Sequence, residues 1–157
     1  RSAAERQALR DAMQHLRCAE LREGLWVRPD NLPDEADPAG ARSIADAQCT
    51  WWTGRPAADP LALADRLFAP TTWAELTNVL TRRIDEVTGR LRAGDAGLEA
   101  DGFLAGAEAL VHVRADPLLP DALLPADWPG DALRDAYRSY RGAFGDATTG
   151  WFRRNRD

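Results

Sequence analysis

Two basic side chains and a tryptophan in the C-terminal half could form a small-molecule site. His112 and Arg114 end a predicted helix, and Trp128 follows them in a proline-rich segment. Small-molecule sites are usually apolar pockets with a few convergent polar groups, and arginine binds carboxylate or phosphate through paired hydrogen bonds. Alternatively, His112 and Arg114 only stabilise the end of the helix, where the helix dipole favours cations. The sequence is compatible with both interpretations.

A second pair of candidate residues lies near the N-terminus. Trp26 and Arg28 alternate along a predicted strand, so their side chains would share one face. They could form one wall of a ligand site. The alternative is a sheet face covered by a helix, with the Arg28 guanidinium reaching water.

The sequence contains none of the common catalytic motifs. Its two histidines, His15 and His112, lie far apart, and no nucleophile elbow, phosphate-binding loop, dinucleotide fingerprint or zinc-protease motif is present. Cys18 and Cys49 have no CxxC spacing, which predicts small buried thiols in a reducing compartment. We therefore expect no enzymatic activity, no metal and no cofactor.

The overall charge and hydropathy limit the possible partners. The 157 residues carry a formal net charge of −5, whereas a domain that binds nucleic acid is usually basic. No apolar run approaches the ~18 residues of a membrane span, and no signal-peptide pattern is present. We expect a cytoplasmic protein that binds neither DNA by itself nor a membrane.

The first third of the chain predicts a small α+β layer. Residues 3–17 have the apolar periodicity of a helix, and residues 18–29 resemble a hairpin that turns at Gly24. Residues 44–53 are rich in β-branched and aromatic types and predict a third strand. The expected fold class is therefore α+β, a partial ferredoxin-like α/β layer over residues 1–56 followed by a helical domain.

Helices are predicted over most of residues 57–157. Asp59-Pro60 is a typical helix start. Residues 72–93 predict a helix that opens with a capping box formed by Thr72 and Glu75. Its apolar stripe, at spacings of three and four, consists of Trp73, Leu76, Leu80, Ile84, Val87 and Leu91. Residues 97–114 predict a further helix whose inward face would hold Phe103, Leu104, Ala107, Leu110 and Val111.

The last predicted helix begins near Asp131, which we expect to be its cap. Three glycines within it each cost up to ~1 kcal/mol relative to alanine. They predict either close contact with another helix or a break near residue 145; they are Gly142, Gly145 and Gly150.

Residues 116–130 connect the last two predicted helices. Four prolines exclude a helix interior, yet the segment also contains four leucines and a tryptophan. One interpretation is an extended, partly polyproline-like strap that lies against the protein. The other is a long loop whose leucines cap a helical core.

Two blocks of sequence resemble one known family. The first is Gly24-Leu25-Trp26-Val27-Arg28-Pro29-Asp30-Asn31-Leu32, and the second comprises Leu110-Val111-His112, Asp116-Pro117, Leu119-Pro120, Leu123-Leu124-Pro125 and Asp127-Trp128-Pro129-Gly130. Both are similar to segments of the PaaX-type transcriptional regulators, the repressors of phenylacetate degradation. The resemblance covers roughly residues 5–155.

The resemblance implies a function for this chain. It would be the central and C-terminal portion of a repressor of phenylacetate-type catabolism, responsible for dimerisation and for sensing an aryl-acyl-CoA such as phenylacetyl-CoA. Operator DNA would be bound by an N-terminal winged helix that these residues lack. The effector would contact Trp26, Arg28, His112, Arg114 and Trp128. The alternative is a stand-alone protein-interaction or scaffold domain.

Overall fold

The computed structural model describes residues 2–33, 40–95 and 99–154, and contacts divide the chain into two units. Unit 1 comprises Arg1–Pro70 and Pro117–Leu124, and unit 2 comprises Thr71–Asp116 and Pro125–Asp157. The chain therefore leaves unit 2 after Asp116 and returns to it at Pro125.

The first part of unit 1 is a helix, a hairpin and a second helix: α1 (Ala3–His15), β1 (Ala19–Arg22), β2 (Leu25–Val27) and α2 (Ala41–Asp46). The two strands are antiparallel and turn at Gly24, whose φ of +75° is one that glycine adopts without strain. A small core of Leu9, Met13, Cys18 and Ala45 joins these elements. Burial in this core raises the pKa of the Cys18 thiol. The predicted N-terminal helix and hairpin are thus confirmed.

The predicted strand over residues 44–53 is wrong. Residues up to Asp46 belong to α2, and residues 51–56 have no regular secondary structure. The Trp51 indole donates to Asp46 Oδ1 at 2.6 Å, and the Arg42 guanidinium lies 4.3 Å from the Trp51 ring centroid. The described residues contain a single two-stranded sheet, so the class is α+β without an established ferredoxin-like layer.

The rest of unit 1 consists of α3 (Pro60–Phe68) and the segment 117–124, which contains a 3-10 turn, η1 (Asp121–Leu123). Asp59 caps α3 as predicted, because its carboxylate accepts from the Ala62 amide at 3.1 Å. The segment contacts α3 through η1, and Leu118 O accepts from Asn31 Nδ2 at 2.9 Å. Leu119 is only 6% exposed. The segment is therefore packed against unit 1, but it is not extended throughout.

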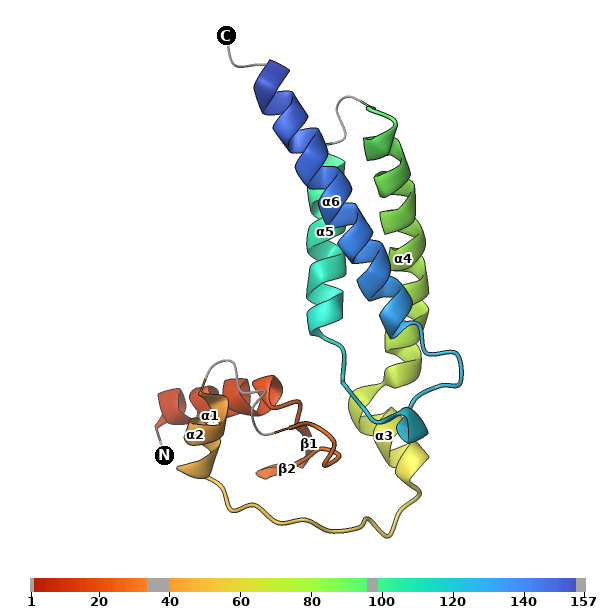
Figure 1. The fold of residues 1–157 in the computed structure, drawn as a ribbon. Coiled ribbons are helices and arrows are strands. Elements are labelled where there is room, and N and C mark those ends of the chain that lie inside the picture. The colour runs from red at the N-terminus through yellow and green to blue at the C-terminus, as the bar shows by residue number, and fades with distance from the viewer. Residues whose placement is uncertain (1, 34–39, 96–98, 155–157) are drawn as a thin grey trace. The chain divides into compact units, whose positions relative to one another are not determined.

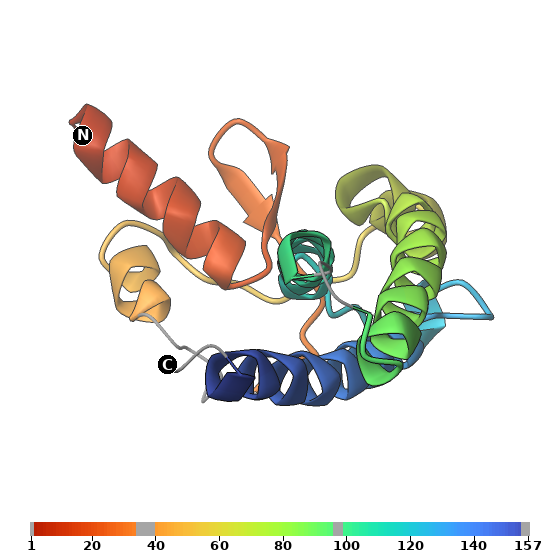
Figure 2. The same cartoon turned by 90° about the horizontal axis from the view of Figure 1, so that it is seen from above.

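Unit 2 contains three helices that lie side by side, α4 (Pro70–Arg92), α5 (Glu99–Arg114) and α6 (Gly130–Arg154) (Figure 1). Figure 2 shows α5 nearly along its axis, next to α4 and α6. The short α4–α5 connection makes these two helices antiparallel. No helix in the described residues has both the length and the apolar content needed to cross a membrane.

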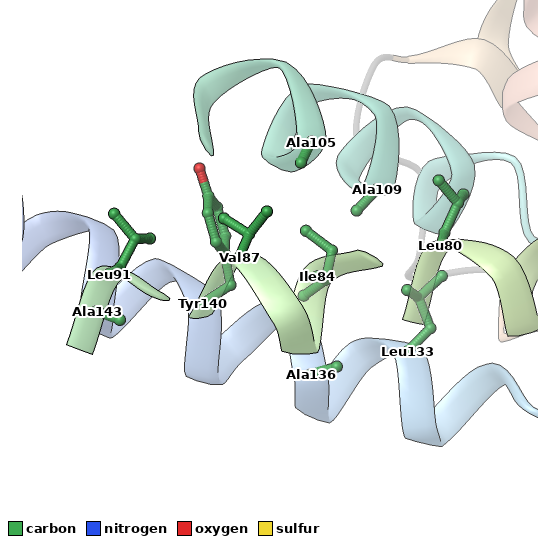
Figure 3. Packing of buried hydrophobic residues seen from close by; sticks show 10 residues of the cluster. All are labelled: Leu80, Ile84, Val87, Leu91, Ala105, Ala109, Leu133, Ala136, Tyr140 and Ala143. Carbon is green, nitrogen blue, oxygen red and sulfur yellow. The ribbon is translucent and has the colours of Figure 1, made fainter. Parts of the chain in front are cut away.

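The core of unit 2 follows the predicted stripe of α4 except at Leu76, which is 49% exposed. Figure 3 shows side chains of α4 and α6 meeting beneath two alanines of α5. The ten core residues are Leu80, Ile84, Val87, Leu91, Ala105, Ala109, Leu133, Ala136, Tyr140 and Ala143. The Tyr140 hydroxyl donates to Gly102 O at 2.7 Å, and burial raises the pKa of this phenol.

The predicted inward face of α5 is wrong. Phe103, Leu104 and Val111 are 63%, 54% and 68% exposed. The buried positions on this helix are mostly small, namely Gly102, Ala105, Gly106 and Ala109. The reason is that α6 supplies Tyr140 and Phe144 against α5, and their rings leave room only for residues with little or no side chain.

Two predicted helix starts are also wrong. α4 begins at Pro70, directly after Ala69 in a left-handed conformation, so Thr72 and Glu75 lie inside the helix. α6 begins at Gly130, and Pro129 O accepts the first helical bond, from the Leu133 amide at 3.1 Å. The C-terminal cap of α4 at Gly94 is confirmed, because its amide bonds to Leu91 O at a φ of +75°.

Helix α6 runs unbroken through its glycines. A β-carbon added at Gly142 or Gly145 would meet nothing within 4 Å, so neither glycine serves a close helix contact. We expect Gly145→Ala to raise the free energy of unfolding by up to ~1 kcal/mol, since alanine favours the helix. Urea unfolding followed by circular dichroism measures this change. A fall in stability would contradict a regular helix at this position.

Candidate functional site

Three aromatic rings stack in unit 2 and join its three helices. Trp73 of α4 lies between His112 of α5 and Trp128, which precedes α6. The ring centroids are 4.6 Å apart for Trp73–His112 and 4.5 Å apart for Trp73–Trp128, with interplanar angles of 12° and 19°. Each such pair contributes about 0.5–1.5 kcal/mol beyond the area it buries. We call these three residues the aromatic stack.

Hydrogen bonds fix the orientation of His112. The Thr77 hydroxyl donates to Trp73 O at 2.8 Å, so its only proton is already used. His112 Nε2 lies 2.8 Å from the same hydroxyl oxygen and 3.1 Å from Trp73 O. Trp73 O can only accept, so its contact with Nε2 is a hydrogen bond in the tautomer that carries the proton on Nε2. In return, the Trp73 indole donates to His112 O at 3.2 Å.

Asp116 and Arg134, which are close in sequence to residues of the aromatic stack, form an ion pair. The Asp116 carboxylate is buried, with its side chain 3% exposed, and it accepts from Arg134 Nη2 at 2.9 Å. Gly130 leaves room for this arrangement, because a β-carbon there would lie 2.5 Å from Trp128 Nε1 and 2.8 Å from Arg134 Nη1. Stack and ion pair together join the two ends of the chain that leave and re-enter unit 2.

The five residues predicted from the sequence to bind an effector do not form one group. His112 and Trp128 both belong to the aromatic stack, whereas Arg114 is exposed at the end of α5. Trp26 and Arg28 belong to unit 1. There Trp26 packs against the small core, and Arg28 Nη1 donates to Leu16 O at 3.4 Å, at the end of α1. Binding by these residues stays a prediction.

A groove lies between the last turns of α4 and the middle of α6. Its volume is about 620 Å³. An apolar floor of Leu91, Ala143 and Ala147 is bordered by basic and polar side chains, Arg92, Arg138, Ser139 and Asp146. Arg92 Nη2 donates to Ser139 Oγ at 2.7 Å, which joins the two helices across the groove. Sequence reasoning did not identify this groove, because its residues come from helices that are separated in the chain.

Comparison with known families bears directly on unit 2. The family model of the PaaX-like protein C-terminal domain matches residues 71–154, which is more than half of the chain. The chain belongs to the PaaX-like family. The second sequence block lies within this match, so its resemblance to the family is confirmed, whereas the first block, residues 24–32, lies outside the matched residues.

One solved structure is similar to this PaaX-like chain over most of its length. It is the uncharacterised protein Rv0674 from Mycobacterium tuberculosis, with 36% sequence identity and a TM-score of 0.68. The match covers 95% of this chain and 57% of that one, so the chain spans little more than half of that protein. No curated protein matches the chain.

The PaaX-like signature acquires a structural explanation from these contacts. Three of its residues, His112, Asp116 and Trp128, take part in the aromatic stack or the ion pair, and Gly130 leaves room for them. Their partners Trp73, Thr77 and Arg134 were missed by sequence reasoning. Thr77 carried a usable signal, because a polar residue on an otherwise apolar helix stripe is expected to have a buried hydrogen-bond partner.

Proposed function

We propose that the chain is the effector-sensing and dimerisation portion of a PaaX-type transcriptional repressor of phenylacetate-type catabolism. The observation that carries the proposal is the family match over residues 71–154, which spans the three helices of unit 2. Operator DNA is bound by a winged helix in another part of the regulator, since this chain has a net charge of −5. The regulator is cytoplasmic and has no enzymatic activity.

The groove between α4 and α6 is the effector site in this proposal. An acyl-CoA combines several phosphate charges with an apolar acyl group. Arg92 and Arg138 stand beside the apolar floor of Leu91 and Ala143, which matches both parts of such a ligand. The aromatic stack is a less suitable site, because His112 is 9% exposed and its Nε2 already contacts Thr77 Oγ1 and Trp73 O.

The effector acts by shifting a conformational equilibrium. An aryl-acyl-CoA such as phenylacetyl-CoA binds one arrangement of the dimer better than another, and only the disfavoured arrangement fits the operator. The groove supports such coupling, because its two walls belong to different helices joined by the Arg92–Ser139 hydrogen bond. A ligand that alters the spacing of α4 and α6 therefore changes the packing of the helices in unit 2.

Calorimetric titration of the chain with phenylacetyl-CoA tests the sensing role. We expect saturable binding that is weaker for free CoA, because the acyl group adds apolar contact. Arg92→Ala should weaken binding about 10–100-fold, the effect of losing one charge-assisted hydrogen bond of about 1.5–3 kcal/mol. Arg141→Ala, which removes an exposed arginine of α6 outside the groove, should leave affinity unchanged.

The same titration separates the two candidate sites. A loss of affinity in Arg114→Ala but not in Arg92→Ala would place the effector at the residues predicted from the sequence. No binding of any acyl-CoA to the chain or to the full-length regulator would refute the sensing role.

An interaction or scaffold domain is the second candidate function. The exposed apolar residues of α5 favour it, because such patches often mark contact surfaces. Operator affinity of the full-length protein that never responds to acyl-CoA would favour this role over sensing.

A further inference from the structure

The groove between α4 and α6 carries a different charge at each end. Arg92 and Arg138 lie at one end, where Arg92 Nη2 donates to Ser139 Oγ at 2.7 Å. Asp146 lies at the other end, eight residues after Arg138 on the same helix, which places it about 12 Å further along the helix axis. Ala147 follows Asp146 in the groove. We call Arg92, Arg138 and Ser139 the basic end, and Asp146 and Ala147 the acidic end.

The basic end keeps hydrogen-bond donors for a ligand. Each guanidinium has five N–H groups, and the bonds made there are those of Arg92 to Ser139 and of Arg138 Nη1 to Asp135 Oδ1 at 2.7 Å. The side chains of Arg138 and Asp135 are 77% and 70% exposed, and a surface ion pair of this kind contributes little. The other N–H groups therefore suit the phosphates of an acyl-CoA.

The middle of the groove is open because one of its residues has no side chain. Gly142 lies between the two ends on α6, and a β-carbon added there would meet nothing within 4 Å. Figure 3 shows Leu91 of α4 beside Ala143 of α6, and both belong to the floor of the groove. Glycine is unfavourable inside a helix, and no helix contact requires it at position 142. The space that it leaves connects the basic end to the acidic end.

The charge of Asp146 is not balanced by its own helix. The side chains that lie next to one another on a helix are three and four positions apart. None of these positions around Asp146 is basic; they hold Gly142, Ala143, Thr149 and Gly150. An anionic group at the acidic end would therefore meet a carboxylate that no helix neighbour compensates, whereas an uncharged group would not be repelled.

We propose that Asp146 selects the effector by the charge of its acyl group: the groove accepts an uncharged acyl group and rejects one that carries its own carboxylate. The phosphates of the acyl-CoA lie at the basic end, the pantetheine arm lies over Gly142, and the acyl group reaches Asp146. Repulsion between like charges acts against the wrong ligand alone, which is an effective way to obtain specificity. This inference rests on the proposed effector site and adds the residue that selects the ligand.

Calorimetric titration with phenylacetyl-CoA and with succinyl-CoA, whose acyl group carries a carboxylate, tests the selection. The wild-type chain should bind phenylacetyl-CoA at least about tenfold more tightly. Asp146→Asn keeps the size of the side chain but removes its charge, so it should tighten succinyl-CoA binding about five- to tenfold. The affinity for phenylacetyl-CoA should stay within about twofold. The control is Asp131→Asn, 98% exposed on α6 outside the groove, which should change neither affinity.

Two glycine substitutions test where the ligand lies. Gly142→Leu places a side chain in the middle of the groove and should weaken the binding of both ligands at least about tenfold. Gly145 is likewise an exposed glycine of α6 with nothing within 4 Å of an added β-carbon, but it lies outside the groove. Gly145→Leu should therefore leave both affinities unchanged. Circular dichroism verifies that both variants fold.

The outcomes separate the selection from the sensing role. If Asp146→Asn leaves the ratio of the two affinities unchanged, Asp146 does not select the ligand, while binding of phenylacetyl-CoA still supports sensing. Equal losses in Gly142→Leu and Gly145→Leu would also overturn the selection, because the ligand would not lie in the groove. If neither the chain nor the full-length regulator binds any acyl-CoA, the sensing role itself is refuted and the selection with it.

Discussion

Trp73→Ala is expected to destabilise unit 2 by about 3–5 kcal/mol, the usual cost of truncating a buried tryptophan. The substitution removes the central ring of the aromatic stack, so both ring contacts are lost together. It also removes the indole donor to His112 O and leaves the His112 ring beside a cavity. Hydrogen exchange of the Ile84 amide, in the core of α4, measures the change within this unit.

The control for Trp73→Ala is Trp52→Ala. Trp52 is 69% exposed and lies in unit 1, so its removal should change stability by no more than about 0.5 kcal/mol. Equal effects of the two substitutions would mean that the stack does not stabilise unit 2. Trp73→Phe keeps a ring between His112 and Trp128 but loses the indole donor, and it should cost about 1–2 kcal/mol.

Gly106→Ala should cost about 1–3 kcal/mol, although alanine is the better helix former. The added β-carbon would lie 2.5 Å from both the Cε1 and the hydroxyl oxygen of Tyr140. The tyrosine cannot move without losing its hydrogen bond to Gly102 O, which is 2.7 Å long and buried. Overpacking therefore outweighs the gain of up to ~1 kcal/mol in helix propensity. Thermal or urea unfolding followed by circular dichroism gives the difference.

Gly89→Ala is the matched control. Gly89 also lies within a helix, but a β-carbon there meets nothing within 4 Å. The same substitution should therefore stabilise the protein at position 89 and destabilise it at position 106. A stabilising Gly106→Ala would show that Tyr140 adjusts freely, contrary to its position in a packed core.

The sequence predicted those elements whose own residues determine them. The Asp59 cap and the Gly94 cap depend on local spacing, and both were confirmed. The α4 stripe was confirmed except at Leu76, which is exposed. The inward face of α5 depends instead on another helix, because the large rings of Tyr140 and Phe144 occupy the space that Phe103 or Leu104 would need. Residue size alone therefore indicated the wrong face.

The candidate site was only partly predictable for a similar reason. His112 and Trp128 were singled out by residue type, but their shared partner Trp73 lies 39 residues before His112 in the chain. The strand expected over residues 44–53 failed because Trp51 is held by Asp46 and Arg42 of α2 rather than by a neighbouring strand. Pairing across the chain is what single-sequence patterns do not contain.

The segment between Asp116 and Pro125 belongs to one unit in the fold but lies within the other in the sequence. Residues 117–124 fall inside the family match of residues 71–154, yet they pack in unit 1. The two units are therefore inherited together. A substitution at the buried Leu119 acts on unit 1, although the sequence segments on both sides of residues 117–124 belong to unit 2. Unit 2 can be encoded as one continuous stretch that carries an eight-residue insert, from Pro117 to Leu124. Unit 1 cannot be encoded as one continuous stretch, because residues 117–124 are encoded between two parts of unit 2.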